Sequence, residues 1–199
     1  MPATGGTAAK TRRRLLDAAS EAFASKGYDA TSVSSDVLEP SGVSVGSFYH
    51  QFPDKAALFA AVVEESAAVA SEAMAALHHA RGGTGDDLAH DSWRRLLDMA
   101  DAHDALFRIQ VRERGNTDPA VAGPLGAVES RWTEALHETY RTNGVFPEGF
   151  PTDAAAELVL ALARGTLEAY LSWPAADRTA RREQLVGDLA AFTLGGFDG

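Results

Sequence analysis

The segment from Val37 to Lys55, reading VLEPSGVSVGSFYHQFPDK, constrains the fold more than any other part of the chain. Gly42 stands between two short apolar runs, where a tight turn between helices needs a positive φ angle that a residue without Cβ adopts freely. Val37, Leu38 and Val43 supply apolar packing across that turn. The segment therefore predicts two short helices joined by a glycine turn, a shape that can enter the major groove of DNA.

The second helix of this pair, predicted over residues 44–50, has small residues in its first turn and aromatic residues in its second. A glycine inside a helix costs about 1 kcal/mol relative to alanine, so Gly46 indicates that another molecule approaches the backbone closely there. A sugar–phosphate strand would be such a molecule, and the hydroxyls of Ser44 and Ser47 can donate to its oxygens or to base edges. We expect Tyr49 and His50 to reach a neighbouring phosphate.

Three blocks of sequence within residues 12–63 resemble, in order, the DNA-binding domain of the tetracycline-repressor (TetR) family of transcriptional regulators. The blocks are RRRLLDAASEAFASKGYDATSV, DVLEPSGVSVGSFYHQF and DKAALFAAVV. The resemblance implies an all-α protein, with a three-helix helix-turn-helix domain in residues 1–52 and a helical effector-binding and dimerisation domain in residues 53–199. It also implies a repressor that binds a palindromic operator, is released by a small-molecule effector, is not an enzyme and needs no cofactor. The DNA contacts carried over from the family are Thr31, Ser32, Ser44, Val45, Gly46, Ser47, Tyr49, His50 and Lys55.

The chain departs from the family pattern at three places. Two serines, Ser34 and Ser35, occupy a stretch where the family spacing has one residue, which lengthens the loop or shifts the start of the second helix. Pro40 lacks a backbone donor and is expected to end that helix early. Val45 is apolar where relatives are often polar or basic, which favours contact with a thymine methyl group.

The same residues fit a second motif, because Gly42 to Gly46 matches the G-x-S-x-G turn of α/β-hydrolases. That turn needs a buried strand directly before the serine, and residues 37–41 are too short and irregular to form one. The hydrolase interpretation is therefore rejected. A helical turn that never meets DNA remains an alternative, as a non-DNA-binding helical interaction protein.

Composition and charge are compatible with a DNA-binding protein. The 199 residues, 45% of them apolar, suffice for one or two domains with a proper core, and the absence of cysteine excludes disulfides and thiolate chemistry. Residues 1–60 carry six basic and six acidic groups, so the rest of the chain holds the whole net charge of −10. A basic cluster at residues 10–14 marks the DNA-facing end. No apolar run can cross a bilayer, so we expect a cytoplasmic protein without a membrane partner.

The remainder of the sequence shows apolar residues at helical spacing and no segment that alternates with period two, so essentially no sheet is expected. Gly27 is predicted to end the first helix, and Asp54 and Asp118 to cap later ones. Residues 152–173 are apolar around most of a helix, which indicates burial on more than one side. With the last helix, over residues 178–194, they predict a two-fold homodimer interface.

Two further patterns concern small molecules and metals. Asp87 with His90 and Glu134 with His137 match the Asp/Glu-x-x-His spacing of di-iron carboxylate bundles, which keeps a helical di-iron enzyme as a rival hypothesis. Aromatic side chains on different helices, with a few polar groups, could instead line an effector cavity, although large aromatics are also ordinary core. The candidate effector-binding residues are Trp93, His103, Phe107, Trp132, His137, Tyr140 and Tyr170.

Overall fold

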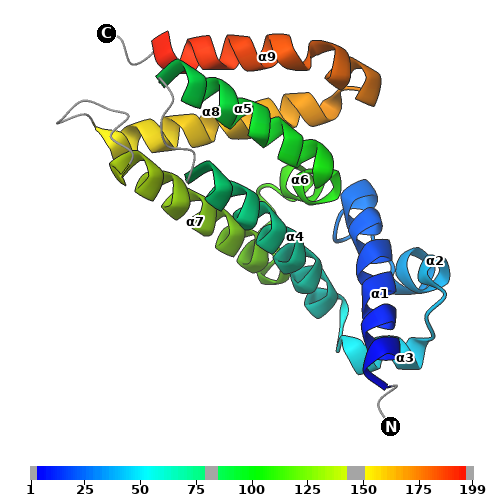
Figure 1. The fold of residues 1–199 in the computed structure, drawn as a ribbon. Helices are drawn as coiled ribbons and strands as arrows, with labels where there is room; N and C mark the ends of the chain where they lie inside the picture. Colours follow the sequence, from blue (N-terminus) through cyan, green and yellow to red (C-terminus); the bar gives the residue numbers. More distant parts are fainter. Residues whose placement is uncertain (1–3, 79–84, 143–150, 196–199) are drawn as a thin grey trace. The chain divides into compact units, whose positions relative to one another are not determined.

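A computed structural model describes residues 4–78, 85–142 and 151–195, and its regular secondary structure in these ranges is entirely helical (Figure 1). The predicted all-α fold is confirmed. In chain order the elements are α1 (Thr4–Lys26), η1 (Val33–Leu38), α2 (Glu39–Ser41), α3 (Val45–Gln51), α4 (Lys55–His78), α5 (Gly85–Ala102), α6 (Asp104–Arg112), α7 (Pro119–Thr142), α8 (Thr152–Ser172) and α9 (Ala175–Gly195).

The chain forms two compact units that each combine segments distant in the sequence. The first unit consists of Met1–Ala68 and Ala105–Val128, so α1, η1, α2 and α3 share it with the start of α4, with α6 apart from its first residue, and with the start of α7. The second unit consists of Val69–Asp104 and Glu129–Gly199, which include α5, α8 and α9. The helix-turn-helix segment is thus packed together with a later part of the chain.

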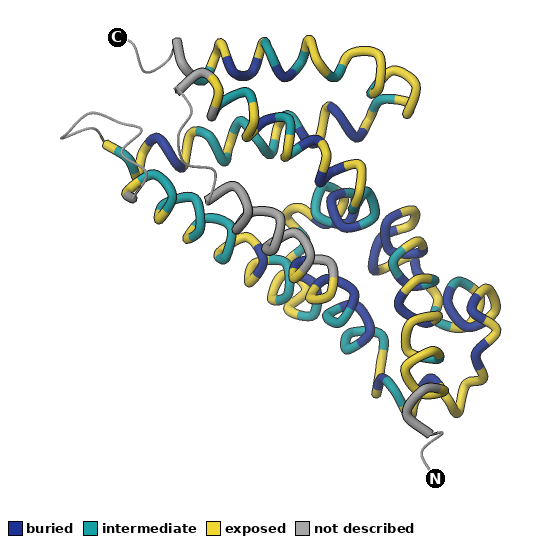
Figure 2. The backbone as a smooth tube through the Cα atoms, viewed as in Figure 1, coloured by how far each residue is buried: buried dark blue, intermediate teal, exposed yellow. Residues whose placement is uncertain are grey.

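The core of the first unit is built on α1. An apolar stripe at helical spacing, which includes Leu15, Ala19 and Phe23, is buried, and in Figure 2 buried segments of this helix alternate with exposed ones. The ring of Phe23 lies edge-on to that of Phe59, with centroids 5.0 Å apart, and 6.0 Å from that of Tyr28. Burial of a phenylalanine on this scale is typically worth about 3–5 kcal/mol against alanine, so α1 and α4 hold each other firmly.

The predicted helix caps are confirmed. Gly27 follows α1 with a φ angle of +84°, and its N–H donates to the carbonyl of Phe23 at 2.9 Å. The carboxylate of Asp54 accepts from the N–H of Ala57 at 2.7 Å, and that of Asp118 accepts from the N–H of Ala120 at 2.9 Å. These side chains satisfy backbone donors that a helix start leaves unpaired.

The additional serine and Pro40, the two departures from the family pattern in the second helix, are both accommodated by a π-helical turn. Val33–Leu38 forms a π-helical turn, in which the N–H of Glu39 donates to the carbonyl of Ser34, five residues earlier. Pro40, which has no N–H to donate, falls where the π-turn gives way to α2, and the helix ends one residue later at Ser41. The early end expected from Pro40 is confirmed, and the additional serine is accommodated within a wide turn.

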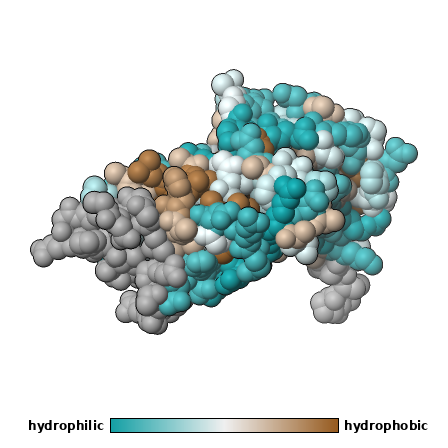
Figure 3. All heavy atoms as spheres, turned by 90° about the horizontal axis from the view of Figure 1, so that it is seen from above, coloured by the Kyte–Doolittle hydropathy of each residue, from teal (hydrophilic) through white to brown (hydrophobic). Residues whose placement is uncertain are grey.

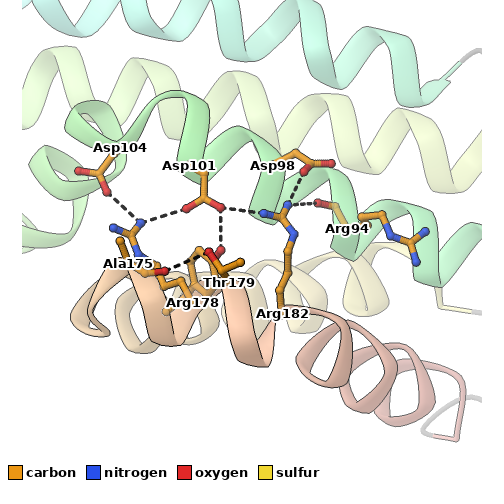
Figure 4. A network of polar contacts seen from close by, with 9 residues as sticks. Arg94, Asp98, Asp101, Asp104, Ala175, Arg178, Thr179 and Arg182 are labelled. Carbon is orange, nitrogen blue, oxygen red and sulfur yellow. Dashed lines mark hydrogen bonds and ion pairs between the residues drawn. The ribbon is translucent and has the colours of Figure 1, made fainter.

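In the second unit, two arginines of α9 bind carboxylates at the end of α5 and the start of α6 (Figure 4). Arg178 donates through Nη1 to Asp101 and to Asp104, each at 3.0 Å. Arg182 donates through Nη1 to Asp101 at 2.7 Å and through Nη2 to Asp98. Because both guanidinium groups are largely buried and multiply bonded, this cluster specifies how α9 packs on α5.

Buried aromatic side chains join the same helices. The indole Nε1 of Trp93 on α5 donates to Oγ1 of Thr193 on α9 at 3.0 Å. The hydroxyl of Tyr170 on α8 donates to Oδ2 of Asp101 at 2.7 Å, and the guanidinium of Arg178 lies 5.6 Å from its ring centroid. These contacts make α5, α8 and α9 one packed layer. None of the described helices is long and apolar enough to span a bilayer.

Candidate nucleic-acid interface

The glycine turn between α2 and α3 is the centre of this site. Gly42 has a φ angle of +60°, its N–H donates to the carbonyl of Glu39, and the N–H of Val43 donates to that of Leu38. A Cβ atom at Gly42 would lie 2.8 Å from Nη2 of Arg14. The exposed Arg14 side chain can move aside, so it is the positive φ angle that calls for glycine here, and the predicted helix–turn–helix is present.

Ser44 is the N-cap of α3, one position before the first helical turn in which it was expected. Its Oγ accepts from the N–H of Ser47 at 3.3 Å, and its hydroxyl donates to Oγ of Ser47 at 2.9 Å. The cap fixes the start of the helix. The hydroxyl of Ser47 remains able to donate to an acceptor outside the protein.

The inward face of α3 is anchored by aromatic rings. Phe48 and Phe52 are buried, with ring centroids 6.1 Å apart. The guanidinium of Arg12 on α1 lies 4.6 Å from the ring centroid of Phe52, within the range of a cation–π contact. This packing leaves the opposite face of α3 pointing away from the core.

That outward face holds the predicted contacts of α3. Gly46, Ser47 and His50 are exposed, and Val45 and Tyr49 are 57% and 62% exposed. A Cβ atom at Gly46 would have no atom of the described chain within 4 Å, apart from its neighbours and its own helical turn. The protein itself therefore gives no reason for a glycine or for two solvent-exposed apolar side chains at this place.

The two predicted contacts before η1 differ in their placement. Thr31 is buried, and its hydroxyl donates to the carbonyl of Gly27 at 2.6 Å, which argues against a contact between this side chain and DNA. Ser32 is exposed and its N–H donates to Oδ2 of Asp36 at 2.8 Å. The sequence pattern aligns Thr31 with the interface, and only the fold shows that its hydroxyl stabilises the loop.

Lys55, at the start of α4, is half-buried and bonded within its own unit. Its ammonium donates to the carbonyl of Tyr28 at 2.7 Å and to that of Thr31 at 3.1 Å, and it lies 4.3 Å from the ring centroid of Tyr28. An ammonium group has three N–H donors, so one is left for a phosphate. Lys55 thus fixes the loop before η1.

Glu113, directly after α6, fixes the other side of the same loop and was not singled out from the sequence. Its buried Oε1 accepts from the N–H of Tyr28 at 2.6 Å, and its Oε2 accepts from Nδ2 of Asn116 at 2.7 Å. The neighbouring Arg112 donates through Nε to the carbonyl of Ala24 at 3.2 Å. A lone glutamate after a helix carries no signal in the sequence that could reveal this role.

The basic cluster of residues 10–14 is only partly available to an outside partner. Arg13 pairs with Asp17 at 2.7 Å and with Glu65 at 2.6 Å, and its hydrogen bond to Asp17, with the nearby charge of Glu65, raises the pKa of the guanidinium. All these side chains are strongly exposed, so the pairs contribute little stability. They do partly neutralise the charge of Arg13, one of the basic residues predicted to face DNA.

Comparison with known proteins agrees with this geometry. The sequence model of the family described as "Bacterial regulatory proteins, tetR family" matches residues 15–62, which span α1 to α4. This part of the chain belongs to the tetR family. The chain is 27% identical over 133 residues to the HTH-type transcriptional repressor AcnR of Corynebacterium efficiens, covering 66% of this chain and 61% of the relative. It is 34% identical over 112 residues to the HTH-type transcriptional repressor Rv1474c of Mycobacterium tuberculosis, covering 56% and 54%.

Among solved structures, Salmonella enterica GusR superposes with a TM-score of 0.72 at 25% identity, covering 95% of this chain and 96% of GusR. The similarity therefore extends over the α-helical body as well as the reading unit. The sequence matches are shorter, because the chain spans about six-tenths of the length of the first repressor it matches.

The candidate effector residues fall in both units. Phe107 belongs to the first unit, and the others belong to the second. Trp93, Phe107 and Tyr170 are buried, while His103, Trp132, His137 and Tyr140 are half-buried. Trp93 and Tyr170 make the hydrogen bonds that hold α5, α8 and α9 together. Burial raises the pKa of Tyr140 to about 12, so this phenol is neutral at physiological pH.

His137 on α7 faces two carboxylates of α8. Its Nδ1 lies 3.6 Å from Oδ1 of Asp153, and its Nε2 lies 3.5 Å from Oε1 of Glu157. These partners differ from Glu134, the residue with which the di-iron spacing pairs it. In the described part of the chain, no three or more His, Asp or Glu side chains are grouped so that they could hold a metal ion.

Proposed function

We propose that the protein is a sequence-specific DNA-binding transcriptional regulator, a repressor released by a small-molecule effector. Residues 1–52 form the DNA-binding domain, and residues 53–199 form the effector-binding and dimerisation domain. The outward face of α3 carries this proposal, because Val45, Gly46 and Tyr49 are exposed on a helix whose other face is fixed by Phe48. Such a face fits the major groove, where Val45 can contact a thymine methyl group and Ser47 a base edge.

A homodimer through the last two helices is part of the same proposal. Where exposure is described, four large apolar side chains are strongly exposed: Val45 and Tyr49 on α3, Leu158 on α8 and Phe192 on α9. Leu158 and Phe192 are 68% and 70% exposed. Figure 3 shows a brown apolar patch on one face of the molecule, while teal covers much of the rest. A second copy of the chain would bury Leu158 and Phe192 in an isologous contact.

The dimer explains how an effector would act. Two α3 helices can enter successive major grooves on one face of DNA only if their centres lie about 34–36 Å apart. An effector that binds better when this separation is wrong lowers operator affinity, typically by about 1–3 kcal/mol, and DNA must weaken the effector equally. The half-buried Trp132, His137 and Tyr140 of α7 remain candidates to contact it. A repressor of this kind acts on the chromosome, in the cytoplasm.

Selection from random duplexes tests the central claim. The full-length protein is expected to enrich one palindromic sequence and to retard DNA upstream of its own gene in a gel shift. Footprinting should show two protected half-sites about 10 base pairs apart, centre to centre, or a multiple of that distance. Failure to enrich any sequence at low salt would refute DNA-binding regulation. It would favour the non-DNA-binding interaction protein, and metal analysis of the purified chain would test the di-iron enzyme separately.

A further inference from the structure

The π-turn of η1 is an unusual feature of the reading unit. π-helical turns are rare, contain one residue more than an α-turn, and occur frequently at functional sites. Within residues 32–39 the bonding changes: the N–H of Asp36 donates to Ser32, four residues back, whereas that of Glu39 donates to Ser34, five residues back. The wider turn therefore accommodates the one additional residue of this segment.

Both sides of the π-turn are fixed to the rest of the unit. At its start, Asp36 binds the N–H of Ser32 at 2.8 Å and the ammonium of Lys26 on α1 at 2.6 Å. The bond to Lys26, followed by that to Ser32, lowers the pKa of this carboxyl, so it stays charged. At its end, Val37 and Leu38 are buried in the core. An extra residue in an α-helix would rotate everything after it by about 100°. The wide turn avoids that rotation, so the additional residue lies on the exposed side of the turn and Val37 and Leu38 stay buried.

The two serines on that exposed side differ in what their hydroxyls contact. Ser34 and Ser35 are both exposed. The Ser35 side chain bonds to the carboxylate of Asp36 and contributes to lowering its pKa. The hydroxyl of Ser34 makes no hydrogen bond with the part of the chain that the structure describes. Ser34 is thus held in place by its backbone while its side chain remains free to bind an outside acceptor.

We propose that the π-turn is a positioning element that presents the Ser34 hydroxyl to an operator phosphate, in the place that the sequence pattern assigns to Thr31. The first helix of a helix-turn-helix unit crosses the DNA backbone, and hydroxyls are common donors to phosphate oxygens. Thr31 cannot supply this donor because its hydroxyl is bonded to Gly27 in the core. The inference rests on the proposed function, because it needs an operator.

The chemistry of the donor gives the test a specific readout. A neutral hydroxyl releases no counterion when it meets a phosphate, so its loss weakens binding without changing the salt slope. Ser34→Ala is expected to lower affinity for the selected operator about tenfold, as for one lost hydrogen bond to a charged group, and to leave the preferred sequence unchanged. Ser34→Thr keeps the hydroxyl and should retain most of the affinity. Ser130→Ala, at an exposed serine of α7, is the control and should bind like the wild type.

Deletion of Ser35 tests the π-turn itself. If the turn acts by presenting Ser34, the deletion should lower affinity by a similar factor, and Ser34→Ala should have no further effect in the deleted protein. Additive losses would overturn the positioning role, and circular dichroism would establish that the deleted protein is folded. If it is not folded, Ser34→Ala and Ser34→Thr decide the matter alone. If the wild type binds the operator and Ser34→Ala binds it with an affinity within twofold of the wild type, this inference is overturned and the proposed function stands. If the wild type does not bind any operator, both are overturned.

Discussion

The Oε1 atom of Glu113 accepts a 2.6 Å hydrogen bond from the backbone N–H of Tyr28, inside the unit that also contains the reading helices. Lys55 binds the carbonyl of the same residue at 2.7 Å. The peptide groups on either side of Tyr28 are therefore held between a carboxylate and an ammonium group. The loop that follows α1 and leads into η1 is fixed by a residue more than 80 positions away in the sequence.

Loss of this carboxylate should destabilise the first unit. Glu113→Ala leaves the N–H of Tyr28 buried without an acceptor, which typically costs about 2 kcal/mol. Glu113→Gln keeps one acceptor oxygen and should lose less. Urea unfolding followed by circular dichroism measures both, with Glu21→Ala, an exposed glutamate of α1, as the control. Equal stability of Glu113→Ala and the wild type would contradict the role assigned to this bond.

Gly46 should respond oppositely in stability and in DNA binding. Gly46→Ala is expected to stabilise the folded chain by about 0.5–1 kcal/mol, because alanine is the better helix former and its Cβ meets no described atom. The same methyl group should lower operator affinity if DNA approaches the backbone there. Gly126→Ala on α7, also in open space, is the matched control and should gain stability without losing affinity. Unchanged affinity of Gly46→Ala would remove α3 from close contact with DNA.

Lys55 should affect both stability and the salt dependence of binding. Lys55→Ala removes the donors to Tyr28 and Thr31, so we expect a lower free energy of unfolding. It should also weaken binding to all duplexes and reduce the magnitude of the salt slope by about one. Binding titrations over a range of salt concentrations measure this. A slope equal to that of the wild type would show that the ammonium serves the loop alone.

The dimer interface is tested by a charge on each exposed apolar side chain. Leu158→Asp and Phe192→Asp should produce monomers in sedimentation experiments, because a carboxylate would have to be buried without a partner. Loss of the dimer should also lower operator affinity, since a monomer cannot bind both half-sites at once. Ala180→Asp, at an exposed residue about 120° around α9 from Phe192, should leave the dimer intact. Dimers of the first two variants would place the interface elsewhere.

The phenols of Tyr140 and Tyr170 predict how the second unit responds to alkaline pH. Burial, with the hydrogen bond to Asp101 as a second cause, raises the pKa of Tyr170 to about 12, and burial raises that of Tyr140 to about 12. A raised pKa means that the folded state favours the neutral phenol. This contribution is complete below pH 10, the ordinary value, and is lost as the pH rises towards 12.

Urea unfolding at several pH values between 8 and 11.5 provides the measurement. The free energy of unfolding of the wild type should decrease above about pH 10. The decrease should be shallower when Tyr140 and Tyr170 are both replaced by phenylalanine. An identical pH dependence in the two proteins would show that neither phenol is protected by the fold.

Local chemistry in the sequence determined the helical elements and the reading unit. Apolar spacing placed the buried stripe of α1, and Gly27, Gly42 and Asp54 marked helix ends, because each turn or cap depends on residues within a few positions. The outward residues of α3 follow for the same reason, since Phe48 and Phe52 fix which face is buried and therefore which face is exposed.

Tertiary structure decided what each polar group does once distant segments meet. Thr31 and Lys55 carry the residue types of DNA contacts, yet their hydrogen bonds go to the loop around Tyr28. Glu113 meets Tyr28, and Asp101 meets Arg182, across more than 80 residues of sequence, and local spacing carries no information about such partners. The extra serine could have lengthened a loop or rotated a helix. The burial of Val37 and Leu38 made a π-turn the solution, because their burial opposes a rotation that would take both residues out of the core.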